Sequence, residues 1–247
     1  MIGLIDGDFI PYTVCHCKKL ENGTIEEKTL SDIKDSTDYF IKSMLRLTSC
    51  DEYIIALTVG KCFRYDIYSD YKANRKYLEK PKFYDEIKEY LITKWKAIYH
   101  KELEADDIIN IYKKTYKDSI IISPDKDMLM LEGFSYNPTK QYFNNIDKET
   151  ADCYFFKSML MGDSADNIPG LPGVGKVGAL KLLEEINSVE GLHKTVKNAY
   201  IQTLGDNAKE YFTEQASLLW MTQQRGQTFF DWMKEYNGAS KRTQDEM

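Results

Sequence analysis

Eight carboxylates in four short clusters are the residues of this chain best suited to chemistry. They are Asp6; Glu104, Asp106 and Asp107; Asp125 and Asp127; and Asp163 and Asp166. Gathered carboxylates repel one another and lose solvation, so a fold that gathers them needs a counter-charge. Divalent cations such as Mg²⁺ prefer oxygen ligands, and a pair of them about 4 Å apart can clamp the attacking and leaving oxygens of phosphodiester hydrolysis. The clusters therefore predict a two-metal nuclease site.

The first three clusters stand beside apolar runs that would place them at one edge of a sheet. Such runs predict buried strands over residues 1–6, 53–58 and 120–123, and amphipathic patterns predict helices over 32–47 and 104–116. Continuous apolar strands separated by helices are typical of a parallel sheet covered on both faces. Open α/β sheets place their sites at the carboxyl ends of the strands. We therefore expect an α/β fold with these carboxylates at that edge.

The remainder of the chain reads as helical. A helix is predicted to begin at Pro81 and reach about Trp95. From about residue 150 the predicted helices cover 154–161, 176–186, 190–203 and 207–222. The change at about residue 150 from alternating strands and helices to helices alone predicts two domains, a catalytic core over 1–150 and a helical subdomain over 151–247. Residues 238–247 are polar and predicted to be frayed.

Composition narrows the function classes. The net charge of −6 argues at first against nucleic acid, but the eight clustered carboxylates account for its sign, and two divalent ions would reverse the field locally. No apolar run approaches the ~20 residues of a membrane span. The N-terminus has no basic region or cleavage site of a signal peptide. These features predict a soluble cytoplasmic protein with no membrane contact.

The five cysteines do not suggest a disulfide framework, because their number is odd and only one close pair exists. That pair, Cys15-His16-Cys17, raises the alternative of a zinc site. It has no second ligand pair at finger spacing, so reduced thiols in a cytosolic protein are the favoured interpretation.

Residues 60–80 are the most basic and aromatic stretch of the chain. Lysines and arginines alternate there with tyrosines and a phenylalanine. This composition suits a track for single-stranded nucleic acid, with charges for phosphates and rings for bases. A solvated loop with locally packed tyrosines explains it equally well.

Each acidic motif has an ordinary alternative. Asp6-Gly7-Asp8 could be a common turn at a strand end, and phosphatases of the haloacid-dehalogenase type also begin with a strand and Asp-x-Asp. Three carboxylates over 104–107 could simply favour the positive end of a helix. Asp125 and Asp127 could lie in a turn between a strand and a short helix.

The segment 162–176 carries the strongest motif. Asp163 and Asp166 are spaced to share a helical face. The turn Gly173-Val174-Gly175 precedes a helix, where free backbone N–H groups can hold a phosphate. A glycine turn between packed helices is the alternative, but an acidic pair only a few residues away makes it a poor explanation.

Together these motifs resemble the flap-endonuclease superfamily, in particular the phage 5′→3′ exonucleases and the 5′-nuclease domain of bacterial DNA polymerase I. The resemblance lies in the order and spacing of Asp6-Gly7, Glu104-x-Asp106-Asp107, Asp125-x-Asp127 and the segment from Gly162 to Gly170, and it covers residues 1 to about 185. It implies a mixed, mainly parallel sheet flanked by helices. It also implies a helical arch over about 60–100 and a helix–three-turn–helix over about 154–186.

The resemblance assigns the carboxylates to two divalent cations, Mg²⁺ or Mn²⁺. The residues that match the family's carboxylates at the first metal are Asp6, Glu104, Asp106, Asp125 and Asp127. Those that match at the second metal are Asp163 and Asp166, with Asp107.

The resemblance also assigns DNA contacts. Lys72 and Arg75 match the family's catalytic contacts with the scissile phosphate, Tyr71 matches a tyrosine that stacks on a base, and Arg64 is expected to contact DNA. The turn 170–176 matches the motif that holds duplex DNA, where family members often bind K⁺ through backbone carbonyls. The residues expected there are Gly170, Gly173, Gly175 and Lys176.

One position departs from the family pattern. Relatives carry an aspartate just after the second strand, where this chain has Val59. We expect weaker binding of the first metal, or a substitute ligand in Asp8 or Asp66. The departure concerns metal affinity and rate more than the class of reaction.

The sequence as a whole predicts a monomeric, metal-dependent 5′ nuclease. Its expected substrate is DNA with a 5′ flap, a duplex end or a single-stranded 5′ end, or an RNA/DNA hybrid in primer removal. A resemblance to phage enzymes implies the host cytoplasm as its location if the source is a phage. A DNA-binding homologue that lost turnover at Val59 is the alternative. An Asp-x-Asp phosphatase is a distant third, because it leaves 160–176 unexplained.

Overall fold

The computed structural model describes residues 1–16 and 28–234, which fall into two compact units. The sheet unit comprises Met1–Cys62, Leu78–Met128 and Gly133–Asn145, and the helical unit comprises Phe63–Tyr77, Leu129–Glu132 and Ile146–Met247. The predicted frayed end at 238–247 and the cysteine at position 17 lie outside the described residues.

The sheet unit is built on five strands in the order β2-β1-β3-β4-β5. Their bounds are β1 Ile2–Asp6, β2 Glu52–Ala56, β3 Ser119–Ile122, β4 Gly133–Asn137 and β5 Tyr142–Ile146. The pairs β1–β2, β1–β3 and β3–β4 are parallel. Because parallel strands share one direction, β1, β2 and β3 present their carboxyl ends at one edge. The three predicted strands are confirmed, and the expected α/β class with a mixed, mainly parallel sheet holds.

β4 and β5 were not predicted from the sequence. Phe134, Tyr142 and Phe143 are exposed, while Asn137, Asn144 and Asn145 interrupt any apolar run. Strands with so little apolar periodicity give no clear signal.

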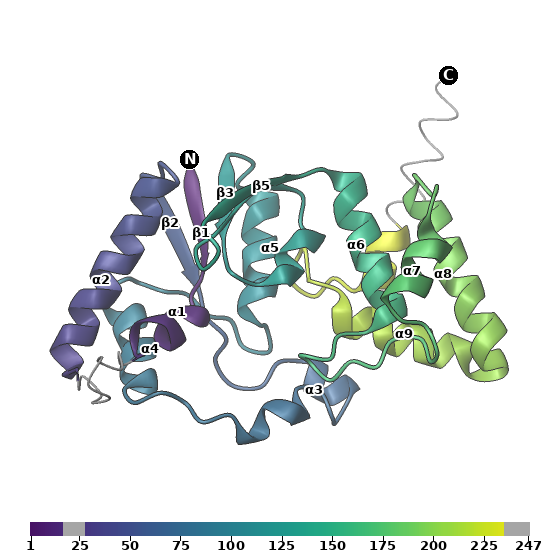
Figure 1. Cartoon of the computed structure of the whole chain (residues 1–247), viewed down its shortest axis with the longest axis horizontal. Helices are drawn as coiled ribbons and strands as arrows, with labels where there is room; N and C mark the ends of the chain where they lie inside the picture. Colours follow the sequence, from purple (N-terminus) through teal and green to yellow (C-terminus); the bar gives the residue numbers. More distant parts are fainter. Residues whose placement is uncertain (17–27, 235–247) are drawn as a thin grey trace. The chain divides into compact units, whose positions relative to one another are not determined.

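Helices cover both faces of the sheet (Figure 1). Helices α1 (Phe9–Val14), α2 (Leu30–Leu47) and α4 (Tyr84–Thr93) pack against one another on one face, and α5 (Ala105–Thr115) packs against β1, β2 and β3 on the other. On the first face, Ile5 of β1 shares a core with Ile33 of α2 and Ile87 of α4. Burial of this apolar surface is the main stabilising term for the unit.

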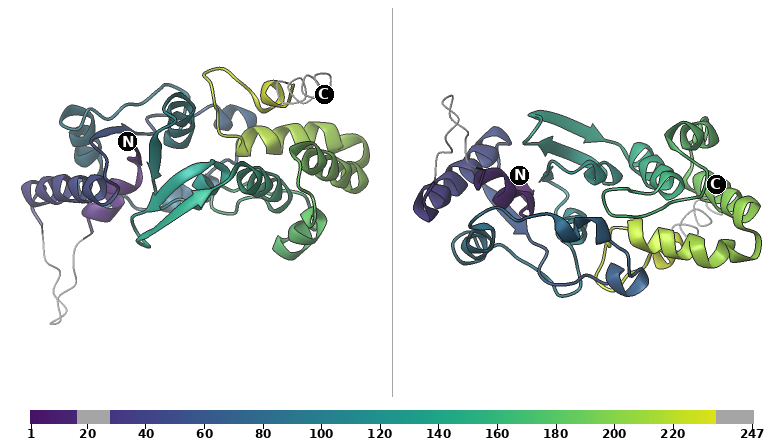
Figure 2. Two further views of the ribbon diagram at one scale, coloured as in Figure 1. Left: turned by 90° about the horizontal axis from the view of Figure 1, so that it is seen from above. Right: turned by 60° about the horizontal axis from the view of Figure 1, so that its bottom comes forward.

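The helical unit is formed mainly by four helices, α6 Lys148–Met161, α7 Lys176–Leu183, α8 Val189–Leu204 and α9 Ala208–Leu219. Helix α6 packs against the other three, and α8 packs against α9 (Figure 2). Shorter pieces of this unit are α3 (Arg64–Ile67) and the 3₁₀ turns η1 (Ala73–Tyr77) and η3 (Gly205–Asn207), whereas the 3₁₀ turn η2 (Lys126–Met130) begins in the sheet unit. Residues 229–234 are also helical, and the fully buried Phe229 packs among the rings of Phe155, Phe212 and Trp220.

Most predicted helices are present, with shifted ends. Helix α6 begins six residues before the predicted start, because Asp147 caps it by accepting the Thr150 N–H at 2.7 Å. The segment 60–100, predicted as an arch within the core, contains α3, η1 and α4, and its part Phe63–Tyr77 belongs to the helical unit. No helix in the described ranges is long and apolar enough to cross a membrane.

Candidate active site

Asp6, the last residue of β1, lies almost fully buried at the carboxyl end of the sheet. Its carboxylate accepts hydrogen bonds from the Ser123 hydroxyl at 2.9 Å and from the Asp8 backbone N–H at 3.0 Å. Burial, then the negative charge of Asp8 and, less strongly, that of Asp125, raises the pKa of Asp6 to about 7, although the two hydrogen bonds oppose the shift. The carboxylates that follow β1 and β3 therefore act on one another, as the spacing predicted.

Asp8 is held beside the end of β2. Its carboxylate accepts the backbone N–H of Thr58 at 3.1 and 3.2 Å, and the Lys88 ammonium of α4 lies 3.2 Å from Oδ1. Lys88 also donates to the Thr58 carbonyl at 2.6 Å. The departure position, Val59, is the next residue, and it is 39% exposed, so its side chain does not pack in the core.

The start of α5 is fixed to the same place. The Ala105 N–H donates to Oγ1 of Thr58 at 2.9 Å. The fully buried carboxylate of Asp107 accepts the Glu104 N–H at 3.1 Å, a local cap that satisfies a free donor of the first turn. Glu104 is buried and Asp106 is half-buried. Glu104 and Asp107 form a reciprocal capping box at this end of α5. Part of the acidic first turn therefore serves helix capping, as the alternative interpretation holds.

The segment after β3 completes this edge. The Asp125 N–H donates to the Ser123 hydroxyl oxygen at 3.1 Å, and the Asp127 N–H donates to Asp125 Oδ1 at 2.9 Å. The Asn137 amide of β4 holds the Pro124 carbonyl at 3.2 Å. Ser123 thus bonds both to Asp6 and to the turn that carries Asp125.

The donors at this edge suit a hard cation. Within residues 1–16 and 28–234, no group of three or more His, Cys, Asp or Glu side chains is arranged to hold a metal ion as the side chains stand. Carboxylate oxygens are nevertheless the ligands that Mg²⁺ prefers. The raised pKa of Asp6 reflects burial first, and then the negative charges of Asp8 and Asp125. The residue types therefore fit divalent cations. For the zinc alternative, Cys15 is buried and position 17 is not described.

In the helical unit, two glycines bring together the ends of the turn that carries Asp163 and Asp166. Gly162 and Gly170 have φ angles of +70° and +68°. A Cβ added to Gly162 would lie 2.2 Å from the Ile168 carbonyl oxygen, and one added to Gly170 would lie 2.2 Å from the Gly162 nitrogen. Both the backbone conformation and the close approach therefore require glycine.

Asp163 is buried inside this turn. Its backbone N–H and carbonyl exchange hydrogen bonds with Ile168, each 2.8 Å long, and its carboxylate accepts the Ala165 N–H at 2.8 Å. The side chain is thereby held in one direction.

Asp166 is paired with the two cations that the resemblance assigns to the scissile phosphate. The Lys72 ammonium lies 3.6 Å from Oδ2, and the Arg75 guanidinium contacts Oδ1. The Tyr71 hydroxyl donates to Oδ2 at 3.2 Å. The predicted metal ligand and the predicted phosphate contacts thus share one carboxylate in this structure.

The segments 70–75 and 163–167 are joined by further bonds. The Lys72 N–H donates to the Asp166 carbonyl at 2.9 Å, the Asn74 amide to the Ser164 carbonyl at 2.7 Å, and the Asn167 amide to the Asp70 carbonyl at 2.8 Å. Lys72 and Arg75 are therefore set by backbone-anchored contacts, although about 90 residues separate the two segments in the chain.

Two residues expected to contact DNA are buried. Arg64 is 3% exposed, and its guanidinium donates to the carbonyls of Leu218 and Trp220, each at 2.8 Å. Tyr71 is 2% exposed, and its ring packs edge-on against Tyr65. The sequence indicated charge and aromaticity here but not that this Arg and Tyr hold the helical unit together.

The turn before α7 faces solvent. Gly173 has a φ angle of +80°, whereas Gly175 is extended at −95°, and neither would meet another atom within 4 Å if it carried a Cβ. Of these two glycines, Gly173 alone has a positive φ. Lys176 begins α7, and the exposed turn leaves room for a ligand at the first N–H groups of that helix.

Several residues that order the site were not predicted. Lys88 donates to the Thr58 carbonyl and to Asp8, which lie 30 and 80 residues away in the chain, so local spacing gave no signal. Ser123 stood directly before the Pro124-Asp125 motif, and that adjacency was the one available signal. Asn74 and Asn167 flank predicted site residues in the sequence, yet their bonds to distant carbonyls left no local pattern.

Two family models match the chain. A 5′-3′ exonuclease N-terminal, resolvase-like domain matches residues 1–152, and a 5′-3′ exonuclease C-terminal SAM fold matches residues 154–224. DNA polymerase I of Lactococcus lactis subsp. cremoris is 31% identical over 196 residues, which is 68% of this chain and 22% of the relative. The 5′-3′ exonuclease of Buchnera aphidicola is 32% identical over 164 residues, 56% of this chain and 51% of the relative. The chain thus spans about a fifth of the polymerase relatives.

A solved structure with a similar fold is the bacteriophage T5 flap endonuclease in a pseudo-enzyme-product complex with DNA and metal ions. The TM-score is 0.62 at 17% identity, and the match covers 88% of this chain and 98% of the phage enzyme. A second structure of the phage T5 5′-exonuclease, with zinc bound, matches with a TM-score of 0.55 at 18% identity, covering 89% of this chain and 99% of the other.

Proposed function

The chain belongs to the 5′-3′ exonuclease family, whose N-terminal domain model covers residues 1–152, and from this we propose that it hydrolyses phosphodiester bonds of DNA at or near 5′ ends. The observation that carries the proposal is the buried Asp6 carboxylate. Burial and the charges of Asp8 and Asp125 raise its pKa, and such a group is expected where a cation is to bind.

The first metal would be held in the sheet unit by carboxylates that share the edge of β1, β2 and β3. The ligands we assign to it are Asp6, Glu104, Asp106, Asp125 and Asp127. Asp163 and Asp166 of the helical unit, with Asp107, are assigned to the second metal. When bound, Mg²⁺ or Mn²⁺ would supply polarisation of the phosphate and of the attacking water.

Asp8 is our choice for the carboxylate that replaces the missing aspartate at Val59. It is bonded to Thr58, the residue before Val59, and its charge acts on Asp6. Asp66, the other substitute considered, is exposed on α3 of the helical unit. Lys88 would balance the charge of Asp8 and keep it beside the end of β2.

Lys72 and Arg75 would stabilise the charge that develops on the phosphate. Bonds between the segments 70–75 and 163–167 position both residues before a substrate binds. In the structure both contact Asp166. A phosphate would have to compete for them, and a cation at Asp166 would release them by satisfying that carboxylate.

The exposed turn at Gly173 and Gly175, with Lys176, would bind the backbone of duplex DNA through N–H groups and the first turn of α7. K⁺ would bind there through carbonyl oxygens. We do not propose Arg64 and Tyr71 as DNA contacts, because both are buried. The solved phage relative with DNA and metal ions supports DNA as the substrate class.

A hydrolysis assay on 5′-labelled DNA tests the proposal. Flapped, blunt-duplex and single-stranded substrates, and an RNA/DNA hybrid, would be compared in Mg²⁺, in Ca²⁺ and with chelator. We expect Mg²⁺-dependent release of short 5′ products. Asp118→Asn is a matched control, since this carboxylate lies at the opposite end of β3 and its side chain is 86% exposed. Duplex binding without cleavage under every condition would favour the alternative, a DNA-binding homologue without turnover.

A further inference from the structure

An apolar groove lies in the helical unit. It is lined by residues between His193 and Lys234, none of which is a proposed catalytic residue. It has a volume of about 370 Å³ and lies among α8, α9 and the helical residues 229–234. Its apolar lining includes Ile201 of α8, Phe212 of α9, and Phe230 and Met233. Ile201 is 48% exposed, so the groove opens to solvent.

The rim of this groove carries one sign of charge. Lys197 of α8, Lys209 of α9 and Lys234 all line it, and among residues 1–16 and 28–234 no Asp or Glu does. Neither Lys197 nor Lys209 makes an ion pair with another residue in the described part of the chain. Lys234 lies 3.7 Å from Asp231, but its side chain is 79% exposed, and such pairs contribute little.

The electrostatic environment of His193 also reflects the positive charge of this groove. It lines the groove, and burial together with the positive charge of Lys197 lowers its pKa. In a chain with a net charge of −6, a groove whose described charged lining residues are all basic is a local feature that the overall composition does not explain.

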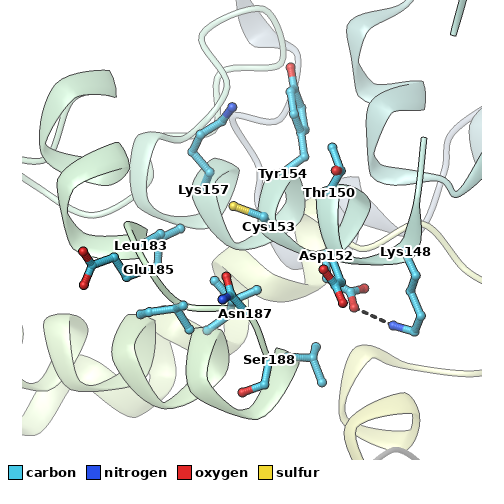
Figure 3. A pocket seen from close by; sticks show the side chains of 14 residues that line it. Lys148, Thr150, Asp152, Cys153, Tyr154, Lys157, Leu183, Glu185, Asn187 and Ser188 are labelled. Carbon is cyan, nitrogen blue, oxygen red and sulfur yellow. Dashed lines mark hydrogen bonds and ion pairs between the residues drawn. The ribbon is translucent and has the colours of Figure 1, made fainter. Parts of the chain in front are cut away.

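A second cavity in the same unit shows the contrast (Figure 3). It has a volume of about 600 Å³ and is lined by side chains of both signs, with Lys148 paired to Asp152, and with Lys157 and Glu185 also at its wall. Mixed charge of this kind selects no class of ligand, so this cavity carries no proposal.

We propose that the groove of α8 and α9 binds a short acidic segment of a partner protein that carries bulky aliphatic or aromatic residues. The apolar residues would fill the groove over Phe230 and Met233, and the carboxylates would meet Lys197, Lys209 and Lys234. A nucleic acid fits less well, because a phosphodiester backbone has no group to fill an apolar floor and the Phe212 ring is only 6% exposed for stacking. The proposal is independent of the metal site.

Fluorescence anisotropy with the full chain tests the proposal. The probe is a fluorescein-labelled synthetic peptide of about ten residues in which Asp alternates with Leu and Phe. Two matched peptides replace the apolar residues by Ser or the Asp residues by Lys. We expect the probe to bind at least about fivefold more tightly than either matched peptide, and more weakly as salt rises from about 50 to 300 mM.

Variants locate the binding. Ile201→Asp and the pair Lys197→Glu with Lys209→Glu should each weaken binding of the probe about fivefold or more. Lys114→Glu, an exposed position on α5 outside the groove, should not. Thermal midpoints close to wild type would show that the variants are folded. Hydrolysis of free DNA should be unchanged in all of them, because none lies in the proposed catalytic machinery.

Three results would overturn the proposal. Equal binding of the three peptides would remove its chemical basis. Displacement of the probe by an oligonucleotide from wild type but not from the Lys197/Lys209 variant would assign the groove to nucleic acid. A concentration-dependent doubling of mass in light scattering, lost with Ile201→Asp, would assign it to a second copy of the chain.

Discussion

The Lys72 ammonium lies 3.6 Å from Oδ2 of Asp166, and both side chains are largely buried, with 17% and 15% of their surface exposed. Arg75 contacts the other carboxylate oxygen. One carboxylate thus holds the two cations that we assign to the reacting phosphate. If Asp166 binds the second metal as we propose, that binding would release Lys72 and Arg75 from this carboxylate.

This arrangement predicts a specific result for Lys72→Met, which keeps the apolar stem and removes the charge. Cleavage in single turnover should fall by roughly 10²–10³, because the lost charge acts mainly on the transition state, while duplex binding in Ca²⁺ changes little. Lys61→Met, an exposed lysine ahead of α3, is the control. Equal losses of rate and affinity would make Lys72 an ordinary phosphate contact.

Neutralising one carboxylate in each unit tests the metal assignment. Asp125→Asn and Asp163→Asn should each lower the Mg²⁺-dependent rate strongly, since each removes an anionic ligand, while duplex binding in Ca²⁺ persists. The rates would be measured at limiting Mg²⁺, with Asp118→Asn as the control. Turnover near that of wild type in both variants would refute the assignment.

The pH dependence of protein stability tests the environment of Asp6 without a substrate. The raised pKa of Asp6, about 7, means that its protonated form favours the folded state. In metal-free protein this contribution is complete below the unfolded pKa and is lost as pH rises toward about 7, an effect on the order of a few kcal/mol. The thermal midpoint in chelator should therefore fall between about pH 4 and pH 7 in wild type, and fall less in Asp6→Asn. Parallel curves for the two proteins would contradict the prediction.

The two kinds of glycine in the motif should respond differently. Gly162→Ala would place a Cβ 2.2 Å from the Ile168 carbonyl at a φ of +70°, so it should destabilise the protein by more than about 2 kcal/mol in denaturant unfolding. Gly175→Val meets no neighbour and needs no positive φ, so it should fold normally and bind duplex DNA more weakly. Normal duplex affinity in folded Gly175→Val would leave the turn a purely structural role.

Val59→Asp tests the departure from the family pattern. Because Val59 is 39% exposed, an added carboxylate escapes the cost of burial, and the thermal midpoint without metal should stay near wild type. The Mg²⁺ concentration for half-maximal cleavage should fall. An unchanged Mg²⁺ dependence would indicate that Asp8 already fills the role at this position.

The sequence by itself determined the sheet edge and its chemistry. Apolar runs at 1–6, 53–58 and 120–123 form the parallel strands β1, β2 and β3, and a parallel arrangement brings their carboxyl ends together. Asp6 and Asp125 could be placed at one edge for that reason alone. The turn before α7 could likewise be predicted from its glycines, because glycine is typical of backbone conformations that other residues avoid.

Only the tertiary structure decided which charges face one another. Arg64 and Tyr71 are residue types that often contact DNA. Packing nevertheless buries both, because α3 and the segment that follows it lie within the helical unit. Lys88 reaches Asp8 across 80 residues, and Lys72 reaches Asp166 across a longer separation still. Such pairs leave no periodicity in the chain, since they depend on where helices and turns pack and not on local spacing.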